Sequence, residues 1–177
     1  MASERIEQEA KESSESSVKS RTVDKKVETK QWVTFSVNNE SFAIEALQVR
    51  EALTYSEITP VPGSNAFICG LINLRGKVIT VIDMRLMFGL PYKAPNDDTN
   101  IVLVDFNEEE LVGFVVDDVQ EVINLPTKSI EIAPKASEGD AKSGFIKGVT
   151  FYNKKMIIIL DIEKIIYYLA PNSEDAL

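Results

Sequence analysis

The residues best placed to do chemistry are two aspartates, Asp83 and Asp161, which occupy the same position in two copies of one sequence pattern. Each copy begins with a glycine, Gly70 or Gly148, and the aspartate follows after twelve intervening residues. Two carboxylates from equivalent parts of a chain can act as a general acid and a general base. An aspartate before apolar residues at helical spacing can equally be a helix N-cap. The neighbouring residues help to decide between these interpretations.

The surrounding sequence favours capping over catalysis. Two-lobed aspartic proteases also supply one aspartate per lobe, followed there by Thr-Gly or Ser-Gly. Here Asp83 is followed by Met84, and Asp161 by Ile162. The chain has no histidine and a single cysteine, Cys69, so it offers no Ser-His or Cys-His nucleophile and no imidazole ligand. We therefore expect no histidine-dependent catalysis, no metal site and no cofactor.

The charge of the chain narrows the range of partners. The net charge is −9 and the sequence pI is about 4.7. A small-barrel nucleic-acid binder needs a basic surface, so we expect no nucleic-acid partner. No apolar run is long enough to span a bilayer, and the first residues lack the apolar core of a signal peptide. We expect a cytoplasmic protein with no direct membrane insertion.

The composition also predicts two tails. Residues 1–30 are rich in Ser, Glu and Lys, contain no aromatic residue, and carry seven positive and seven negative side chains. Such a segment cannot bury enough apolar surface to offset the entropy of ordering it. We predict a disordered N-terminal tail over 1–30 and a short C-terminal tail over 171–177.

The repeat extends beyond the aspartates and defines the predicted fold. Each copy has two short apolar strands around polar turn residues, which predicts a β-hairpin; Val49–Glu51 is matched by Val119–Glu121. We predict a mainly β protein of two pseudo-repeated subdomains, about 31–92 and 99–160, with short helices and a C-terminal helix over 161–169. Each subdomain has about five strands, close to the content of a small closed barrel. Such small units should pack together and form a groove between them.

An ordered series of short motifs resembles the CheW family of bacterial chemotaxis coupling proteins. The motifs span nearly all of the chain from Gln31 to Leu169, in the order FAIE (42–45), VRE (49–51), ITPVP (58–62), GLINLRG (70–76), VIDMR (81–85), GFVVDDV (113–119) and LDIEKI (160–165). The resemblance implies a CheW-like domain over 31–170, built of two five-stranded SH3-like β-barrels packed on a shared core. This agrees with the repeat.

The resemblance also implies a function. Members of the family are non-enzymatic adaptors that bind the cytoplasmic tip of a chemoreceptor, a methyl-accepting chemotaxis protein, and the regulatory domain of the histidine kinase CheA. The receptor then controls the kinase within an array. We expect these two partners, with the chain monomeric alone and in a higher-order array with them. The alternative is a CheW-like adaptor of a non-flagellar chemosensory system that controls twitching or gliding.

The resemblance further implies a receptor-binding surface in the groove between the subdomains. By motif position, the candidate residues are Val49, Glu51, Arg75, Val115 and Val119. Each has a structural alternative. The valines can be ordinary core residues, and Glu51 can be a solvated acid. Arg75 can form an intramolecular ion pair with Glu51 or Asp83, which would stabilise the fold little if exposed.

Kinase-binding surfaces are implied on both subdomains. The candidate in the second subdomain is the hairpin with Phe145, Ile146 and Gly148. Phe145 can equally be an apolar plug inside the subdomain. For Gly148 we favour a role in backbone geometry over a contact, because glycine permits positive φ and close approach.

Overall fold

The computed structural model describes residues 26–133 and 143–170, which form two β-sheets joined by short helices. The elements are β1 (Thr29–Val37), β2 (Glu40–Glu45), η1 (Ala46–Gln48), β3 (Val49–Thr54), β4 (Ile68–Leu74), β5 (Lys77–Asp83), α2 (Met84–Met87), β6 (Asn100–Asp105), β7 (Leu111–Val116), β8 (Asp118–Pro126), η2 (Thr127–Ser129), β9 (Glu131–Ile132), η3 (Ser143–Phe145), β10 (Ile146–Tyr152), β11 (Lys155–Leu160) and α3 (Ile162–Leu169). The mainly β fold class is confirmed.

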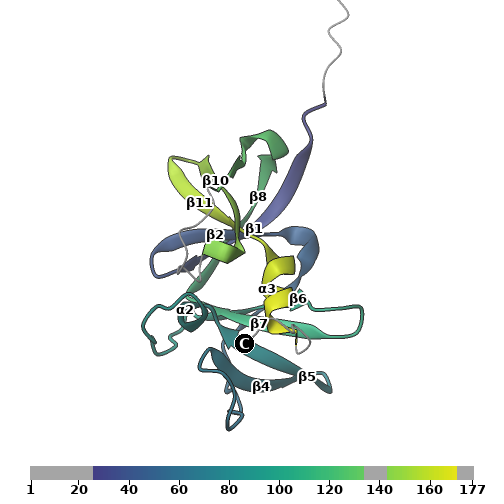
Figure 1. Ribbon diagram of the computed structural model, residues 1–177, viewed down its shortest axis with the longest axis vertical. Helices are drawn as coiled ribbons and strands as arrows, with labels where there is room; N and C mark the ends of the chain where they lie inside the picture. The colour runs from purple at the N-terminus through teal and green to yellow at the C-terminus, as the bar shows by residue number, and fades with distance from the viewer. Residues whose placement is uncertain (1–25, 134–142, 171–177) are drawn as a thin grey trace, which may run out of the picture.

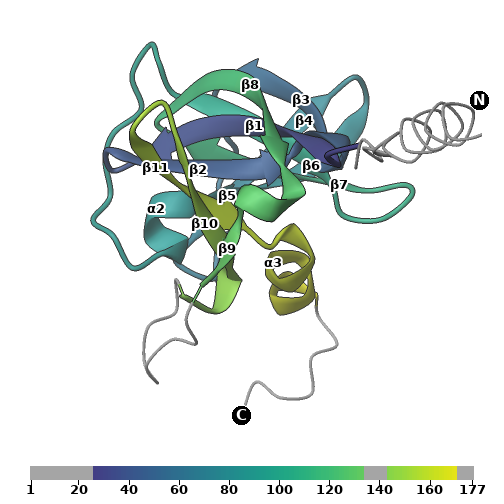
Figure 2. The same ribbon diagram turned by 90° about the horizontal axis from the view of Figure 1, so that it is seen from above.

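The strands divide into two sheets of different size. The six-stranded sheet has the order β8-β1-β2-β11-β10-β9, and the five-stranded sheet has the order β3-β6-β7-β5-β4. The sixth strand of the larger sheet, β9, has only two residues. In Figure 1 the larger sheet forms the upper lobe and β4 and β5 lie at the lower end, with α3 between the lobes. Seen from above, β1 and β2 lie over β6 and β7 (Figure 2).

The boundary between the sheets is not the boundary between the sequence repeats. The five-stranded sheet is built from one continuous segment, residues 49–116, and the six-stranded sheet from 29–45 together with 118–160. The division predicted at 31–92 and 99–160 therefore does not match the sheets. Each repeat places its first hairpin in one sheet and its later strands in the other. Sequence similarity reveals equivalent strands, whereas hydrogen bonding between distant strands decides which of them pair.

The pairing follows the same plan in both sheets. The hairpin β1–β2 lies between β8, which is antiparallel to β1, and β11, which is parallel to β2. The equivalent hairpin β6–β7 lies between β3, antiparallel to β6, and β5, parallel to β7. Central strands such as β2 and β6 are buried on both faces, which explains why they are continuous apolar runs.

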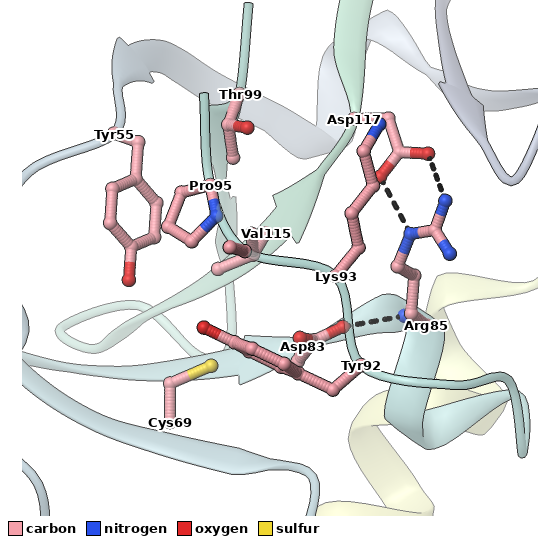
Figure 3. A pocket seen from close by; sticks show the side chains of 11 residues that line it. Tyr55, Cys69, Asp83, Arg85, Tyr92, Lys93, Pro95, Thr99, Val115 and Asp117 are labelled. Atoms are coloured by element: carbon pink, nitrogen blue, oxygen red, sulfur yellow. Dashed lines mark hydrogen bonds and ion pairs between the residues drawn. The ribbon is translucent and has the colours of Figure 1, made fainter. Parts of the chain in front are cut away.

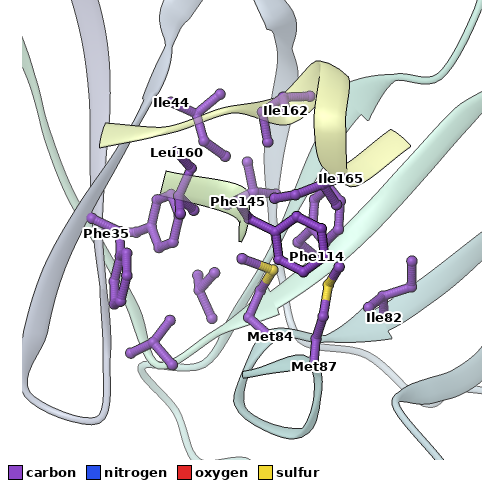
Figure 4. Packing of buried hydrophobic residues seen from close by; sticks show 14 of the residues in the cluster. Phe35, Ile44, Ile82, Met84, Met87, Phe114, Phe145, Leu160, Ile162 and Ile165 are labelled. Carbon is purple, nitrogen blue, oxygen red and sulfur yellow. The ribbon is translucent and has the colours of Figure 1, made fainter. Parts of the chain in front are cut away.

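The main core lies between the two sheets. It contains Phe35 and Phe42 from the six-stranded sheet and Phe114 from the five-stranded sheet, all with no exposed surface. Ile162 and Ile165 cover this core from α3, as Figure 4 shows. Two smaller apolar clusters lie within the individual sheets. Because the largest cluster is shared, we expect neither sheet to be stable without the other.

Local sequence explains the hairpins and the helix starts. The turns at Asn38–Asn39, Arg75–Gly76 and Asn153–Lys154 have positive φ at both central residues, as type I′ hairpin turns require. Asp83 accepts hydrogen bonds from the backbone N–H groups of Arg85 and Leu86, at the start of α2. Asp161 accepts from Lys164 N–H at the start of α3. The capping interpretation of both aspartates is confirmed.

The remaining sequence expectations concern the ends of the chain. The C-terminal helix occurs at Ile162–Leu169. The predicted tails over 1–30 and 171–177 lie almost entirely outside the described residues. Residues 26–30 of the first tail are described, and the predicted tail extends too far, because residues 29 and 30 already belong to β1.

The two repeated glycines have a shared structural role. Gly70 and Gly148 each lie at a bulge in the pairing of their hairpin. A Cβ at Gly70 would overlap with the carbonyl oxygen of Thr59, and a Cβ at Gly148 would lie 2.5 Å from the carbonyl oxygen of Glu131. In each case another segment crosses directly over the glycine, so the repeat preserves this close approach.

The close approach of Thr59 to Gly70 predicts that adding one methyl group at position 70 destabilises the fold. Gly70→Ala should lower the free energy of unfolding by about 2 kcal/mol or more, because the new methyl group displaces backbone rather than a flexible side chain. Gly144→Ala is the matched control, because a Cβ there meets no described atom within 4 Å. Urea unfolding followed by circular dichroism measures both. Equal stability of the two variants would contradict the argument.

Candidate functional site

An arginine–glutamate ion pair joins the β4–β5 turn of the five-stranded sheet to β3. Arg75, in the β4–β5 turn, donates from Nη1 to Oε1 of Glu51 at 3.0 Å and from Nη2 to Oε2 at 3.1 Å. Gly76 and Asn73 hold the turn through a hydrogen bond from Gly76 N–H to Asn73 Oδ1. The Arg75 side chain is 74% exposed, so the pair should contribute only ~0–1 kcal/mol to stability. Its guanidinium remains accessible to a partner.

The pair belongs to a larger surface feature that we call the charged depression. It has a volume of about 420 Å³ and is formed by β3, the β4–β5 turn and the β6–β7 turn. Its lining has three basic and five acidic side chains over an apolar base, namely Arg50, Arg75, Lys77, Glu51, Asp105, Glu108, Glu109 and Glu110, with Leu74, Ile79 and Leu111. A second exposed ion pair, Arg50–Asp105 at 2.7 Å, spans β3 and β6. This arrangement can bind a complementary polar surface.

The six-stranded sheet carries an equivalent depression with different chemistry. It has a volume of about 520 Å³ and is formed by the start of β8, the β10–β11 turn, Thr34 and Ser41. Asn153 occupies the turn position that Arg75 has in the other sheet, and Glu121 occupies the position of Glu51. The two sheets thus share a fold, but only one has the arginine.

The structure brings together some of the five candidate receptor-binding residues. Glu51 and Arg75 are in direct contact. Val49 and Val119 are half-buried at the starts of β3 and β8 and pack against the main core. Val115 pairs with Ile101 across β6–β7 and lines a different, smaller cavity. Val115 therefore does not share a surface with Arg75.

The candidate kinase-binding residues are mostly structural. Phe145 is only 8% exposed and contacts the ring of Tyr168 at a centroid distance of 5.4 Å. Ile146 packs against the main core, and Gly148 is buried beneath β9. Buried atoms cannot form a docking surface without rearrangement, so the burial of Phe145 favours its alternative role as an apolar plug. A kinase contact at these residues stays a prediction.

Sequence reasoning missed the exposed apolar residues of the same hairpin. Phe151 and Met156 are directly opposite one another on β10 and β11 and are 70% and 51% exposed. The available signal was the period-two alternation of strands, which places Phe151 on the opposite face from the buried Thr150.

A small cavity beside α2 contains the most perturbed ionisable groups. Asp83, Arg85 and Asp117 lie around it together with Cys69, as Figure 3 shows. Burial raises the pKa of Asp83, and the hydrogen bonds from Leu86 and Arg85 N–H only partly offset this. Burial, reinforced by the charge of Asp83, raises the pKa of Cys69 to about 11. The Cys69 thiol is therefore protonated near neutral pH and is a poor nucleophile.

Asp117 behaves differently because it has a charged partner. Burial alone would raise its pKa, but hydrogen bonds from the Arg85 guanidinium and from Asn38 N–H lower it. Arg85 donates from Nε at 2.9 Å and from Nη2 at 2.8 Å, and Asn38 N–H donates at 2.8 Å. Asp117 is therefore an ionised residue joined to two other elements.

The described residues contain neither a candidate metal site nor a helix that could span a membrane. Among residues 26–133 and 143–170, no three His, Cys, Asp or Glu side chains are grouped so that they could hold a metal ion. No helix within these ranges has the length and apolarity needed to cross a bilayer.

Comparison with known proteins defines the class. A family model described as a CheW-like domain matches residues 31–169, which is most of the chain. The chain belongs to the CheW family, and the resemblance found in its motifs is confirmed. The family comprises scaffold proteins rather than enzymes.

Individual relatives agree with the family assignment. The chain is 33% identical to the chemotaxis protein CheW of Bacillus subtilis (strain 168) over 134 residues, covering 76% of this chain and 85% of that protein. It is 30% identical to CheW of Klebsiella aerogenes, covering 77% and 81%. The crystal structure of the scaffolding protein TtCheW from Thermoanaerobacter tengcongensis is similar with a TM-score of 0.69 and 35% identity, covering 76% of this chain and 90% of that one. This neighbour confirms the fold of two SH3-like subdomains.

The raised pKa of Asp83 makes a prediction about pH. The unfolded chain releases this proton at a lower pH than the folded chain, so the contribution of Asp83 to stability is complete below about pH 4 and is lost as the pH rises through the folded pKa. Asp83→Asn keeps a capping side chain but cannot ionise. Its stability relative to wild type should therefore increase from about pH 3 to pH 7.

Urea unfolding at both pH values measures this difference. Asp161→Asn is the matched control for loss of a capping carboxylate, because Asp161 has the equivalent position at α3. If the stability of Asp83→Asn relative to wild type is the same at both pH values, ionisation of the buried Asp83 carboxyl does not destabilise the folded protein.

Proposed function

We propose that this chain is a non-enzymatic adaptor that couples chemoreceptors to a CheA-type histidine kinase. The observation that carries the proposal is the exposed Arg75–Glu51 pair at the edge of the charged depression, in a chain of the CheW family. An arginine fork that adds little to stability but stays accessible is suited to binding a partner carboxylate. The adaptor acts in the cytoplasm, recruited to receptor arrays at the membrane.

The receptor's helical tip is the partner proposed for the side that carries Arg75. Val49 and Val119 lie just after the two places where the chain passes between the sheets, η1 and Asp117. They are thus at the seam between the subdomains, and Glu51 follows Val49 by two residues along β3. A helix lying along this seam would contact apolar side chains there and reach the charged depression beside it.

The regulatory domain of the kinase is proposed to bind other surfaces. That domain is itself CheW-like, so the contact would join two similar folds. Phe151 and Met156 offer exposed apolar area on the β10–β11 hairpin of the six-stranded sheet, whereas the Arg75 turn belongs to the five-stranded sheet. Exposed aromatic and methionine side chains are enriched at protein interfaces. On the six-stranded sheet we therefore propose Phe151 and Met156 as the contact residues, in place of the buried Phe145 and Gly148.

Calorimetry tests the kinase partner directly. Titration of the full chain into a purified CheA-type regulatory domain should give 1:1 binding with a Kd at or below about 1 μM, equivalent to about −8 kcal/mol. Phe151→Ser should weaken this binding without lowering the melting temperature, because the side chain is already exposed. No heat and no co-elution with the cognate kinase would contradict the adaptor function.

The Arg75 turn tests the receptor partner. Arg75→Glu should weaken association with a receptor-tip fragment at least tenfold, about 1.4 kcal/mol, and leave the melting temperature nearly unchanged. Lys26→Glu makes the same change in net charge on an exposed residue outside both sheets. The double variant Arg75→Glu/Glu51→Arg restores an intrachain pair but not the position of the guanidinium. Native binding by Arg75→Glu, or full recovery in the double variant, would show that Arg75 is not a contact.

A further inference from the structure

The chain passes between the two sheets at two equivalent places that differ in their polar contacts. One passage is η1, between β2 and β3, and the other is Asp117, between β7 and β8. At the first passage η1 has no side-chain capping hydrogen bond, and Leu47 is 87% exposed. At the second passage, Asp117 takes part in several hydrogen bonds. Among the described residues, the Asp117 side chain joins the second passage to two other elements, whereas η1 has no side-chain capping hydrogen bond at the first.

Asp117 joins three elements at its passage. Its carboxylate accepts two hydrogen bonds from Arg85 on α2, at 2.9 and 2.8 Å, and one from Asn38 N–H in the β1–β2 turn at 2.8 Å. Its own N–H donates to Ser36 O at 2.9 Å. α2 follows β5 of the five-stranded sheet, whereas Asn38 and Ser36 belong to the six-stranded sheet. We call Arg85, Asp117 and Asn38 the latch.

The ion pair of the latch is largely buried, so solvent screens it less than the surface ion pairs. The Arg85 and Asp117 side chains are 12% and 18% exposed, compared with 74% for Arg75 and 58% for Arg50 in the surface ion pairs. Apolar contacts in the main core hold the sheets together, but they have no preferred direction. A two-point guanidinium–carboxylate contact does have one. A contact of this kind can add orientation to the attraction that the core supplies.

We propose that Arg85 and Asp117 are positioning residues that set the angle between the two subdomains for a partner seated across both. This rests on the proposed function, in which the receptor tip lies along the seam. The latch itself touches no partner. Its loss should change the relative placement of Val49 and Val119, and so weaken binding along the seam, while a surface confined to one sheet keeps its shape.

A distance measurement on the free protein tests the orientation. Spin labels at Thr54 and Lys147, exposed positions on the five- and six-stranded sheets, report the angle in a Cys69→Ala background. Asp117→Asn should broaden or shift the distance distribution. Glu45→Gln is the matched control, because it removes an ion pair with Lys30 that lies within one sheet. Arg85→Lys, which keeps the charge but not the fork, is the second latch variant should Asp117→Asn fail to fold.

Binding measurements on the same unlabelled variants give the second readout. The latch variants should bind a receptor-tip fragment at least fivefold more weakly and bind the kinase regulatory domain within twofold of wild type. Distance distributions in both latch variants that match wild type overturn the proposal, and so does native receptor affinity in variants whose distances have changed. If wild type binds neither partner, the proposed function fails, whereas the distance distributions still decide whether the latch sets the angle.

Discussion

The chain passes between the two sheets twice, and this connectivity determines how the whole protein is assembled. The five-stranded sheet is formed by residues 49–116, and the six-stranded sheet needs the segments on both sides of it. Neither sheet can be completed from one sequence repeat. Phe42 and Phe114, on the two sheets, are accordingly buried in one shared core. We expect the two subdomains to unfold as one cooperative unit for this reason.

The same arrangement explains how one fold presents two kinds of surface. Pseudo-symmetry gives each sheet a depression at the end of its hairpin turn, but the turn residue is Arg75 in one and Asn153 in the other. An exposed turn residue can change with little effect on folding, because it is solvated before and after folding. Equivalent backbones can therefore carry different recognition chemistry, which suits an adaptor proposed to bind two partners.

The features that could be predicted from sequence are local ones. The hairpin turns and the caps formed by Asp83 and Asp161 depend on a few adjacent residues and their backbone geometry. The sequence offered two possible intramolecular partners for Arg75, namely Glu51 and Asp83. The choice between Glu51 and Asp83 required the structure, because Asp83 is buried beside Arg85 on α2.

We could read the repeat, the hairpins, the C-terminal helix, the family resemblance and the residues of the Arg75 turn from the sequence. The folded structure was needed to show that each repeat places its first hairpin in the other repeat's sheet, that Phe145 and Gly148 are buried, and that Asp117 joins Arg85 to Asn38. The reason is physical. Periodicity and turn chemistry act over a few residues, whereas strand pairing, burial and the contacts of a single carboxylate depend on segments brought together from distant parts of the chain.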